Sequence, residues 1–224
     1  MLRDALEDLG DRIHASRAVV EVRASGCGAE PTVASGVVLR HNARTVVAVP
    51  AQVVAGATAV EGEGWPFPLP VDMEVVAFDP RLDVALLQAT LTVPAGRERR
   101  DVAGDFTNGV DVSTGETPDR AEVLRWTPTG TAAVVVDIVG PFEETLGDIY
   151  GDQEVVRQVL QVNGDFVAGA LPAGAPIIDE GGDLIGIIDD RSPADGSAWA
   201  AVATELMPAL ETVGYDVVDN GTCP

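Results

Sequence analysis

The strongest constraint on the fold of this chain is a succession of short apolar runs, rich in β-branched residues and separated by turn residues. Runs of this length and composition are typical of strands. A stretch containing Arg and Gly, 94–109, divides them into two sets, and two sets of short strands predict a pair of small all-β barrels. The predicted strands cover residues 19–23, 33–40, 45–49, 71–78, 84–89, 110–113, 121–126, 131–139, 155–162, 176–179, 184–188 and 199–202.

A helix is predicted at each end of this strand-rich region. The N-terminal helix has an apolar stripe at spacings of four and three residues, formed by Leu2, Leu6, Leu9 and Ile13. This stripe either packs on the protein's own barrel or contacts a partner subunit. The expected organisation is therefore an N-terminal helix (1–15), a first barrel (16–100), a second barrel (101–202), and a C-terminal helix and tail (203–224).

The charge of the chain narrows the classes of partner. The sequence has 36 acidic residues against 14 basic ones, all of them Arg, so the formal net charge is -22. A surface this acidic disfavours nucleic acid and anionic membranes as partners. Because molar salt screens self-repulsion, we interpret the charge as adaptation to a very salty medium, with codon bias in a GC-rich genome as the alternative.

No targeting or membrane-spanning segment is recognisable in the sequence. Residues 1–10 lack the apolar core of a signal peptide. The longest apolar stretch, 45–60, is shorter than the roughly 20 residues that a membrane helix needs. We therefore expect neither export through a signal of its own nor membrane insertion, and a halophile cytoplasm or a virion is the expected location.

Motifs for metal, nucleotide or cofactor binding are missing from the sequence, so no cofactor and no metal are expected. His14 and His41 are the only histidines, and we expect both to be ordinary surface or turn residues. A weak cation site at two acidic turns is conceivable, but a solvated acidic surface explains these residues better. They are Asp179, Glu180, Asp183, Asp189 and Asp190.

Three segments together carry a family resemblance. Residues 36–57 read GVVLRHNARTVVAVPAQVVAGA, residues 78–88 read FDPRLDVALLQ, and residues 169–188 read GALPAGAPIIDEGGDLIGII. In this order and spacing the chain resembles trypsin-like serine proteases of the HtrA and MarP type, over roughly residues 18–210. The resemblance implies a trypsin-like double β-barrel, here with the added N-terminal and C-terminal helices.

Carried over to this chain, the catalytic triad of the family is incomplete. The family histidine falls on Gln52, the aspartate on Asp83 and the serine on Ala173. An acyl transfer of this type needs a hydroxyl nucleophile and an imidazole base, whereas Ala173 has no side-chain heteroatom and the Gln52 amide does not titrate. Leu171 and Pro172 replace the flexible Gly-Asn of the family before the serine position, so the oxyanion hole is expected to be lost as well.

Two interactions near the triad positions follow from this comparison. Asp83 is best interpreted as a turn residue that bonds to nearby backbone, and the Gln52 side-chain amide could donate to its carboxylate. Cys27 and Cys223 alone would suggest two free thiols in a cytosolic protein. Members of the MarP type, however, have one Cys just after the first strand and another near the C-terminus, and this resemblance implies a Cys27–Cys223 disulfide.

We therefore expect a catalytically inactive protein that acts by binding other proteins. In one hypothesis it is a structural subunit of a larger assembly, such as a halophilic virus particle, with its N-terminal helix docked on a neighbouring subunit. In the other it is a free regulatory or peptide-binding pseudoprotease in a halophilic cell. The expected partners are accordingly other protein subunits or an extended peptide.

Overall fold

The computed structural model describes residues 13–28, 30–41, 44–65, 67–90, 109–127, 129–164, 171–189 and 197–224. The predicted N-terminal helix lies mostly outside these ranges, which exclude Leu2, Leu6 and Leu9. Residues 13–16 are helical, and the Ile13 side chain is 45% exposed. Within the described ranges, the predicted all-β class is confirmed.

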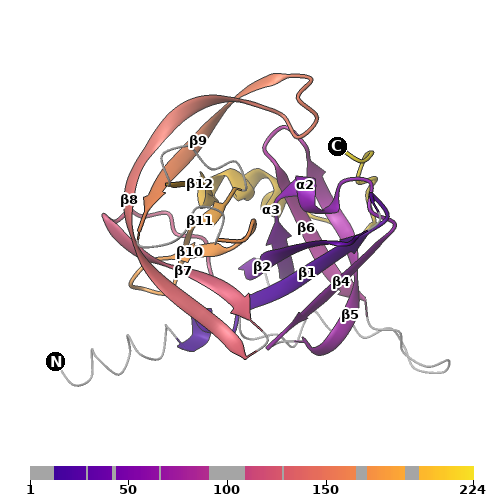
Figure 1. Ribbon diagram of the computed structural model, residues 1–224, viewed down its shortest axis with the longest axis horizontal. Coiled ribbons are helices and arrows are strands. Elements are labelled where there is room, and N and C mark those ends of the chain that lie inside the picture. The colour runs from indigo at the N-terminus through magenta and orange to yellow at the C-terminus, as the bar shows by residue number, and fades with distance from the viewer. Residues whose placement is uncertain are drawn as a thin grey trace.

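Six antiparallel strands form the first barrel (Figure 1). They pair in the order β1-β2-β3-β6-β5-β4, and β4 pairs back with β1, which closes the sheet. A one-turn helix, α2 (Ala51–Val54), follows β3 directly. The strands are β1 (Val19–Ser25), β2 (Thr32–His41), β3 (Arg44–Val49), β4 (Ala59–Gly64), β5 (Phe67–Asp79) and β6 (Val84–Thr90).

Six further strands close the second barrel in the order β10-β11-β12-β9-β8-β7. The predicted closing helix is a 3-10 turn, η2 (Ala203–Leu206), followed by α3 (Met207–Thr212). Figure 1 shows these helices near the junction of the two barrels. The strands are β7 (Arg120–Thr127), β8 (Gly130–Gly147), β9 (Glu154–Asn163), β10 (Pro176–Ile178), β11 (Leu184–Ile188) and β12 (Ala198–Val202).

The alternation of apolar and charged residues explains why these segments form half-buried strands. In β1, Val20, Val22 and Ala24 are buried, and the intervening Glu21 and Arg23 are more exposed. Successive side chains of a strand point to opposite faces, so this alternation places the valines in the barrel core. Apolar burial of this kind supplies most of the stabilisation of each barrel.

The sequence prediction missed β4, and it predicted a strand over residues 110–113 that the structure does not contain. β4 contains Gly62 and Gly64 and lacks the β-branched pattern. A Cβ atom on Gly62 would collide with the Met73 side chain, so this glycine makes room for Met73 in the first barrel. Residues 110–113 form no strand, only isolated parallel bridges to β2 and β11.

The segment before β7 is bonded to both barrels. The Val110 N–H donates to the Val38 carbonyl at 3.0 Å, and the Arg40 N–H donates to the Val110 carbonyl at 3.1 Å. Three residues further on, the Ser113 N–H donates to the Leu184 carbonyl of the second barrel at 2.8 Å. This segment therefore ties the two barrels together.

The C-terminal tail returns to the first barrel and is covalently attached there. A disulfide joins Cys27 to Cys223, with 5.5 Å between their Cα atoms, which confirms the predicted bridge. The Val218 N–H also donates to the Val75 carbonyl at 2.9 Å. The disulfide and this hydrogen bond both hold the tail on the first barrel.

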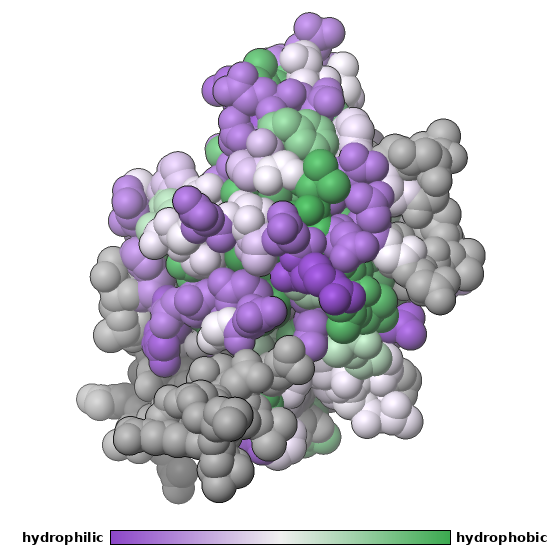
Figure 2. Space-filling view, turned by 90° about the vertical axis from the view of Figure 1, so that its left-hand side faces the viewer, coloured by the Kyte–Doolittle hydropathy of each residue, from purple (hydrophilic) through white to green (hydrophobic). Residues whose placement is uncertain are grey.

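The surface is rich in polar groups. The face shown in Figure 2 is largely hydrophilic, with small apolar patches between the polar side chains. Acidic side chains are exposed on strands of both barrels, among them Glu61, Asp72, Asp137, Glu143 and Glu154. Among the helices of the described residues, none has the length and apolarity needed to cross a membrane.

Candidate junction site between the barrels

The three triad-like positions lie where the barrels meet. Gln52 is on α2, Asp83 immediately precedes β6, and Ala173 lies in the turn before β10. The Ser35 N–H of the first barrel donates to the Ala173 carbonyl at 2.9 Å. The next residue's N–H donates to the Ile188 carbonyl of the second barrel at 2.8 Å, so the turn that carries Ala173 is bonded to both barrels.

Asp83 is held in a specific backbone conformation. Its side chain is buried and its φ is 55°, a left-handed conformation that few residues other than glycine adopt. Its Oδ1 accepts a hydrogen bond from the Gln52 backbone N–H at 2.9 Å. This contact fits the interpretation of Asp83 as a carboxylate bonded to nearby backbone, whereas a bond from the Gln52 side-chain amide stays a prediction.

The turn before β10 is tightly constrained. Leu171 is buried, and Pro172 brings no N–H to the turn. Gly174 has a φ of 79°, and a Cβ atom there would collide with the Ser35 carbonyl oxygen. Only glycine therefore fits at position 174, and Ala173, which precedes it, brings a methyl group to the junction.

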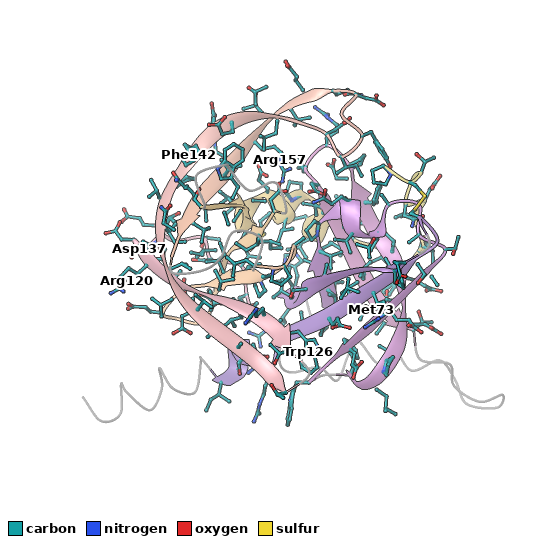
Figure 3. The ribbon with its side chains drawn as sticks, viewed as in Figure 1. Met73, Arg120, Trp126, Asp137, Phe142 and Arg157 are labelled. Carbon is teal, nitrogen blue, oxygen red and sulfur yellow. A yellow bond between two sulfur atoms is a disulfide. The ribbon has the colours of Figure 1, made fainter. Side chains whose placement is uncertain are left out.

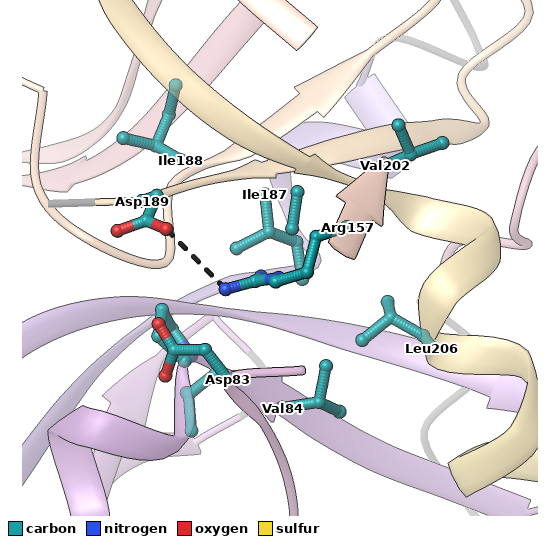
Figure 4. Close-up of a pocket in the computed structure, with 11 residues that line it drawn as sticks. Asp83, Val84, Arg157, Ile187, Ile188, Asp189, Val202 and Leu206 are labelled. Carbon is teal, nitrogen blue, oxygen red and sulfur yellow. Dashed lines mark ion pairs between the residues drawn. The ribbon is translucent and has the colours of Figure 1, made fainter. Parts of the chain in front are cut away.

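A buried arginine occupies the junction close to these positions. Arg157 of β9 is 1% exposed in its side chain and lines a cavity of about 10 Å³ together with Asp83 and Asp189. Its Nη1 lies 3.8 Å from the Asp189 carboxylate (Figure 4), and its Nε lies 3.6 Å from the Glu205 carboxylate. Arg157 therefore joins the second barrel to the C-terminal 3-10 turn through charge.

Burial controls the protonation of Glu205. Desolvation raises the pKa of its carboxyl group, and the Gln158 N–H, which donates to Oε1 at 2.7 Å, and the nearby Arg157 charge counteract this shift. Among the described residues, neither Nε nor Nη1 of Arg157 has a hydrogen-bond partner. These two nitrogens therefore contribute positive charge near the carboxylates and no short, well-aligned hydrogen bond.

The cavity at this junction is small and partly lined by charged groups. A cavity of about 10 Å³ has room for a single water molecule at most. Its polar groups are carboxylates and a guanidinium, and a guanidinium does not release its proton in proteins. The junction is therefore a contact in which Arg157 bridges the carboxylates of Asp189 and Glu205. The side chains that line its cavity include no hydroxyl or thiol nucleophile.

Arg157 was not identified from the sequence, although one signal was present. In β9 the buried residues Val155, Arg157 and Val159 alternate with more exposed ones, so the arginine stands at an inward position. An arginine at such a position needs a buried acidic partner. That partner, Asp189, was assigned to the solvated acidic surface; this assignment was wrong, because Asp189 is 5% exposed.

Asp179 and Asp183 bond to each other in the turn before β11. Asp179 Oδ1 accepts the N–H groups of Gly181 and Asp183 at 2.9 and 3.0 Å, an ordinary turn contact. No group of three potential metal ligands is present in the described ranges, which exclude Asp190. His14 lies part-buried 3.4 Å from the Gly109 carbonyl, and His41 ends β2.

Comparison with known structures identifies the architecture. The Rv3671c protease from M. tuberculosis, in its active form, superposes with a TM-score of 0.76 at 23% sequence identity, covering 98% of this chain and 91% of that chain. The chain has the trypsin-like double-barrel fold. The MamO protease domain from Magnetospirillum magneticum matches with a TM-score of 0.63 at 18% identity, covering 88% and 97%.

An HtrA-type protease, AlgW with a tripeptide, also shares the fold. Its TM-score is 0.64 at 18% identity, covering 92% of this chain and 64% of that chain. No protein-family model and no curated protein matches the sequence. At these identities the likeness establishes the fold alone, which confirms the predicted double barrel.

Proposed function

We propose that this protein is a catalytically inactive trypsin-like fold that works as a protein-binding or structural module. The observation that carries the proposal is the pair of residues at the junction, Gln52 on α2 and Ala173 in the turn before β10. Neither side chain can act as a nucleophile or as a base. Asp83 alone retains its type, and a carboxylate without an imidazole does not activate a serine-type nucleophile.

Covalent serine-hydrolase probes test the inactivity directly. A fluorophosphonate should not label the protein, and casein or a peptide library should remain intact. The double variant Gln52→His and Ala173→Ser should regain little activity, because Leu171 and Pro172 replace an oxyanion-hole turn whose donors are each worth about 10²–10³ in rate. Labelling of the unmodified protein above a heat-denatured control would refute the proposal.

An extended peptide or a neighbouring subunit is the partner that the fold supports. AlgW, which has this fold, has been solved with a tripeptide. We propose that a larger assembly, such as a halophilic virus particle, is the main setting, with a free regulatory module as the alternative. The disulfide favours an oxidising environment over a reducing cytoplasm, because glutathione keeps cytosolic thiols reduced.

Sedimentation at high salt separates the two settings. Residues 1–12 can be deleted without touching the buried Ala15 or the Ser16 carbonyl, which accepts the Thr131 hydroxyl at 2.6 Å. If the apolar stripe docks on a neighbour, the shortened chain should melt like the full chain and lose its partner. A full chain that sediments as a 23.2 kDa monomer in extracts and when pure would exclude the assembly.

A further inference from the structure

Asn220 fastens the C-terminal tail to the end of α2. Its Nδ2 donates to the Val54 carbonyl at 2.7 Å and to the Ala57 carbonyl at 3.0 Å. Its own carbonyl accepts the Gly56 N–H at 3.0 Å. Three hydrogen bonds from one residue therefore hold the tail against the loop that directly follows the helix of Gln52.

The residues around Asn220 fix its backbone as well. The Gly221 N–H donates to Asp219 Oδ1 at 2.9 Å, and Gly221 has a φ of 72°. A Cβ atom at Gly221 would collide with the Tyr150 hydroxyl oxygen, so this position requires glycine. Two residues further on, Cys223 is bonded to Cys27.

An Asn-Gly step has its own chemistry. The Gly221 backbone nitrogen can attack Cγ of Asn220; the Cγ–Nδ2 bond breaks, and ammonia leaves with the proton from the Gly221 nitrogen. Water then opens the resulting succinimide at either carbonyl, which yields aspartate or isoaspartate without any oxidant or reductant. Both groups that must move, Nδ2 and the Gly221 N–H, are hydrogen-bonded in the folded tail.

We propose that Asn220 is a deamidation site that the closed Cys27–Cys223 bridge protects, and that its deamidation permanently unfastens the tail from the end of α2. The chemistry of the deamidated product explains why the tail would be released. An ionised carboxylate at position 220 has no proton to donate, and it faces the Val54 and Ala57 carbonyl oxygens, which are also acceptors. Two attractive contacts thus become repulsive, and the tail no longer rebinds in the same way.

Peptide-mapping mass spectrometry with isoaspartate detection tests the protection. The bridged protein and a synthetic peptide of residues 216–224, whose cysteine is alkylated so that it cannot attack the bridge, are incubated in separate samples at neutral pH. Because the tail must open locally before the attack, Asn220 should react about 100-fold more slowly in the protein, a factor equivalent to about 2.8 kcal/mol. Equal rates in the protein and the peptide would overturn the proposal.

The same chain provides an internal control for the role of the bridge. Asn163 also precedes a glycine, and its described hydrogen bond is made by Oδ1, which accepts from Gln161 at 3.3 Å. In the Cys27→Ser and Cys223→Ser double variant, the rate at Asn220 should rise about tenfold or more while the rate at Asn163 is unchanged. An unchanged rate at Asn220 would contradict protection by the bridge.

If the double variant unfolds, deamidation will accelerate at both sites and the comparison will not isolate the bridge. The deamidated product is then tested directly, by introducing aspartate at position 220 in the bridged protein. Asn220→Asp should lower the melting temperature by several degrees at neutral pH. The deficit should shrink below about pH 4, where the acid regains a donor proton. Asp219→Asn, which keeps the Oδ1 acceptor for Gly221, is the matched control and should melt like the wild type. A variant Asn220→Asp that melts within about 1 °C of the wild type would overturn the proposal.

Discussion

Replacing Arg157 by methionine should destabilise the protein strongly. The substitution leaves the Asp189 and Glu205 carboxylates, 5% and 13% exposed, without the cation that lies 3.8 and 3.6 Å from them. Removing one partner of a buried ion pair costs about 3–5 kcal/mol, because the remaining charge stays buried. For a chain of this size, at about 2–4 °C per kcal/mol, the melting temperature should fall by about 6–20 °C.

A matched control is available on the surface of the same barrel. Arg120 and Asp137 form a pair at 3.4 Å with side chains 72% and 71% exposed, and Figure 3 shows both at the outside while Arg157 lies inside. Arg120→Met should cost no more than about 1 kcal/mol. Denaturant unfolding of both variants gives the comparison. An Arg157→Met variant within about 1 kcal/mol of the control would refute our interpretation of the junction.

A charge-free junction should recover much of this loss. The triple variant Arg157→Met, Asp189→Asn and Glu205→Gln keeps the side-chain volumes close to the original and removes the charge from both carboxylates that lose the arginine as their partner. It should unfold at a higher denaturant concentration than Arg157→Met alone. A further loss of stability in the triple variant would mean that packing of the guanidinium, and not its charge, is the main contribution.

Three further outcomes are expected. Removing the bridge with Cys27→Ser and Cys223→Ser should cost up to about 5 kcal/mol in denaturant unfolding, because the disulfide closes a loop with a sequence separation of 196; a loss below about 1 kcal/mol would contradict this. The melting temperature should rise from low salt to molar KCl, since the screening length falls to about 3 Å; a flat curve would tie the charge to genome composition. Because burial raises the pKa of Glu205, the protonated form is favoured in the folded state, and its stabilisation is lost as pH rises through that pKa. We therefore expect the melting temperature of Glu205→Gln, measured relative to that of the wild type, to increase as pH rises from 4 to 7. A relative melting temperature that decreases over this range would contradict the raised pKa of Glu205.

The sequence predicted the fold because the information for it is local. Alternating valines mark the strands, and three motifs in order mark the double barrel. The disulfide followed from the family resemblance. Contacts between distant parts of the chain carry little local signal. Arg157 on β9 pairs with Glu205 on the C-terminal 3-10 turn. Gly62 on β4 leaves space for the Met73 side chain of β5. The tail contacts of Asn220 have no local signal either, because their partners Val54 and Ala57 lie 166 and 163 residues away along the chain.

The covalent link between Cys27 and Cys223 also determines how the molecule would respond to mechanical force. Tension applied between Ile13 and Pro224 would pass directly through the bridge and bypass the second barrel, whose strands all lie inside the covalent loop. Only the short chain before Cys27, including β1, could be pulled out, and at about 3.5 Å per residue this would lengthen the molecule by at most about 50 Å. Under load, the second barrel would therefore remain folded until the bridge itself breaks.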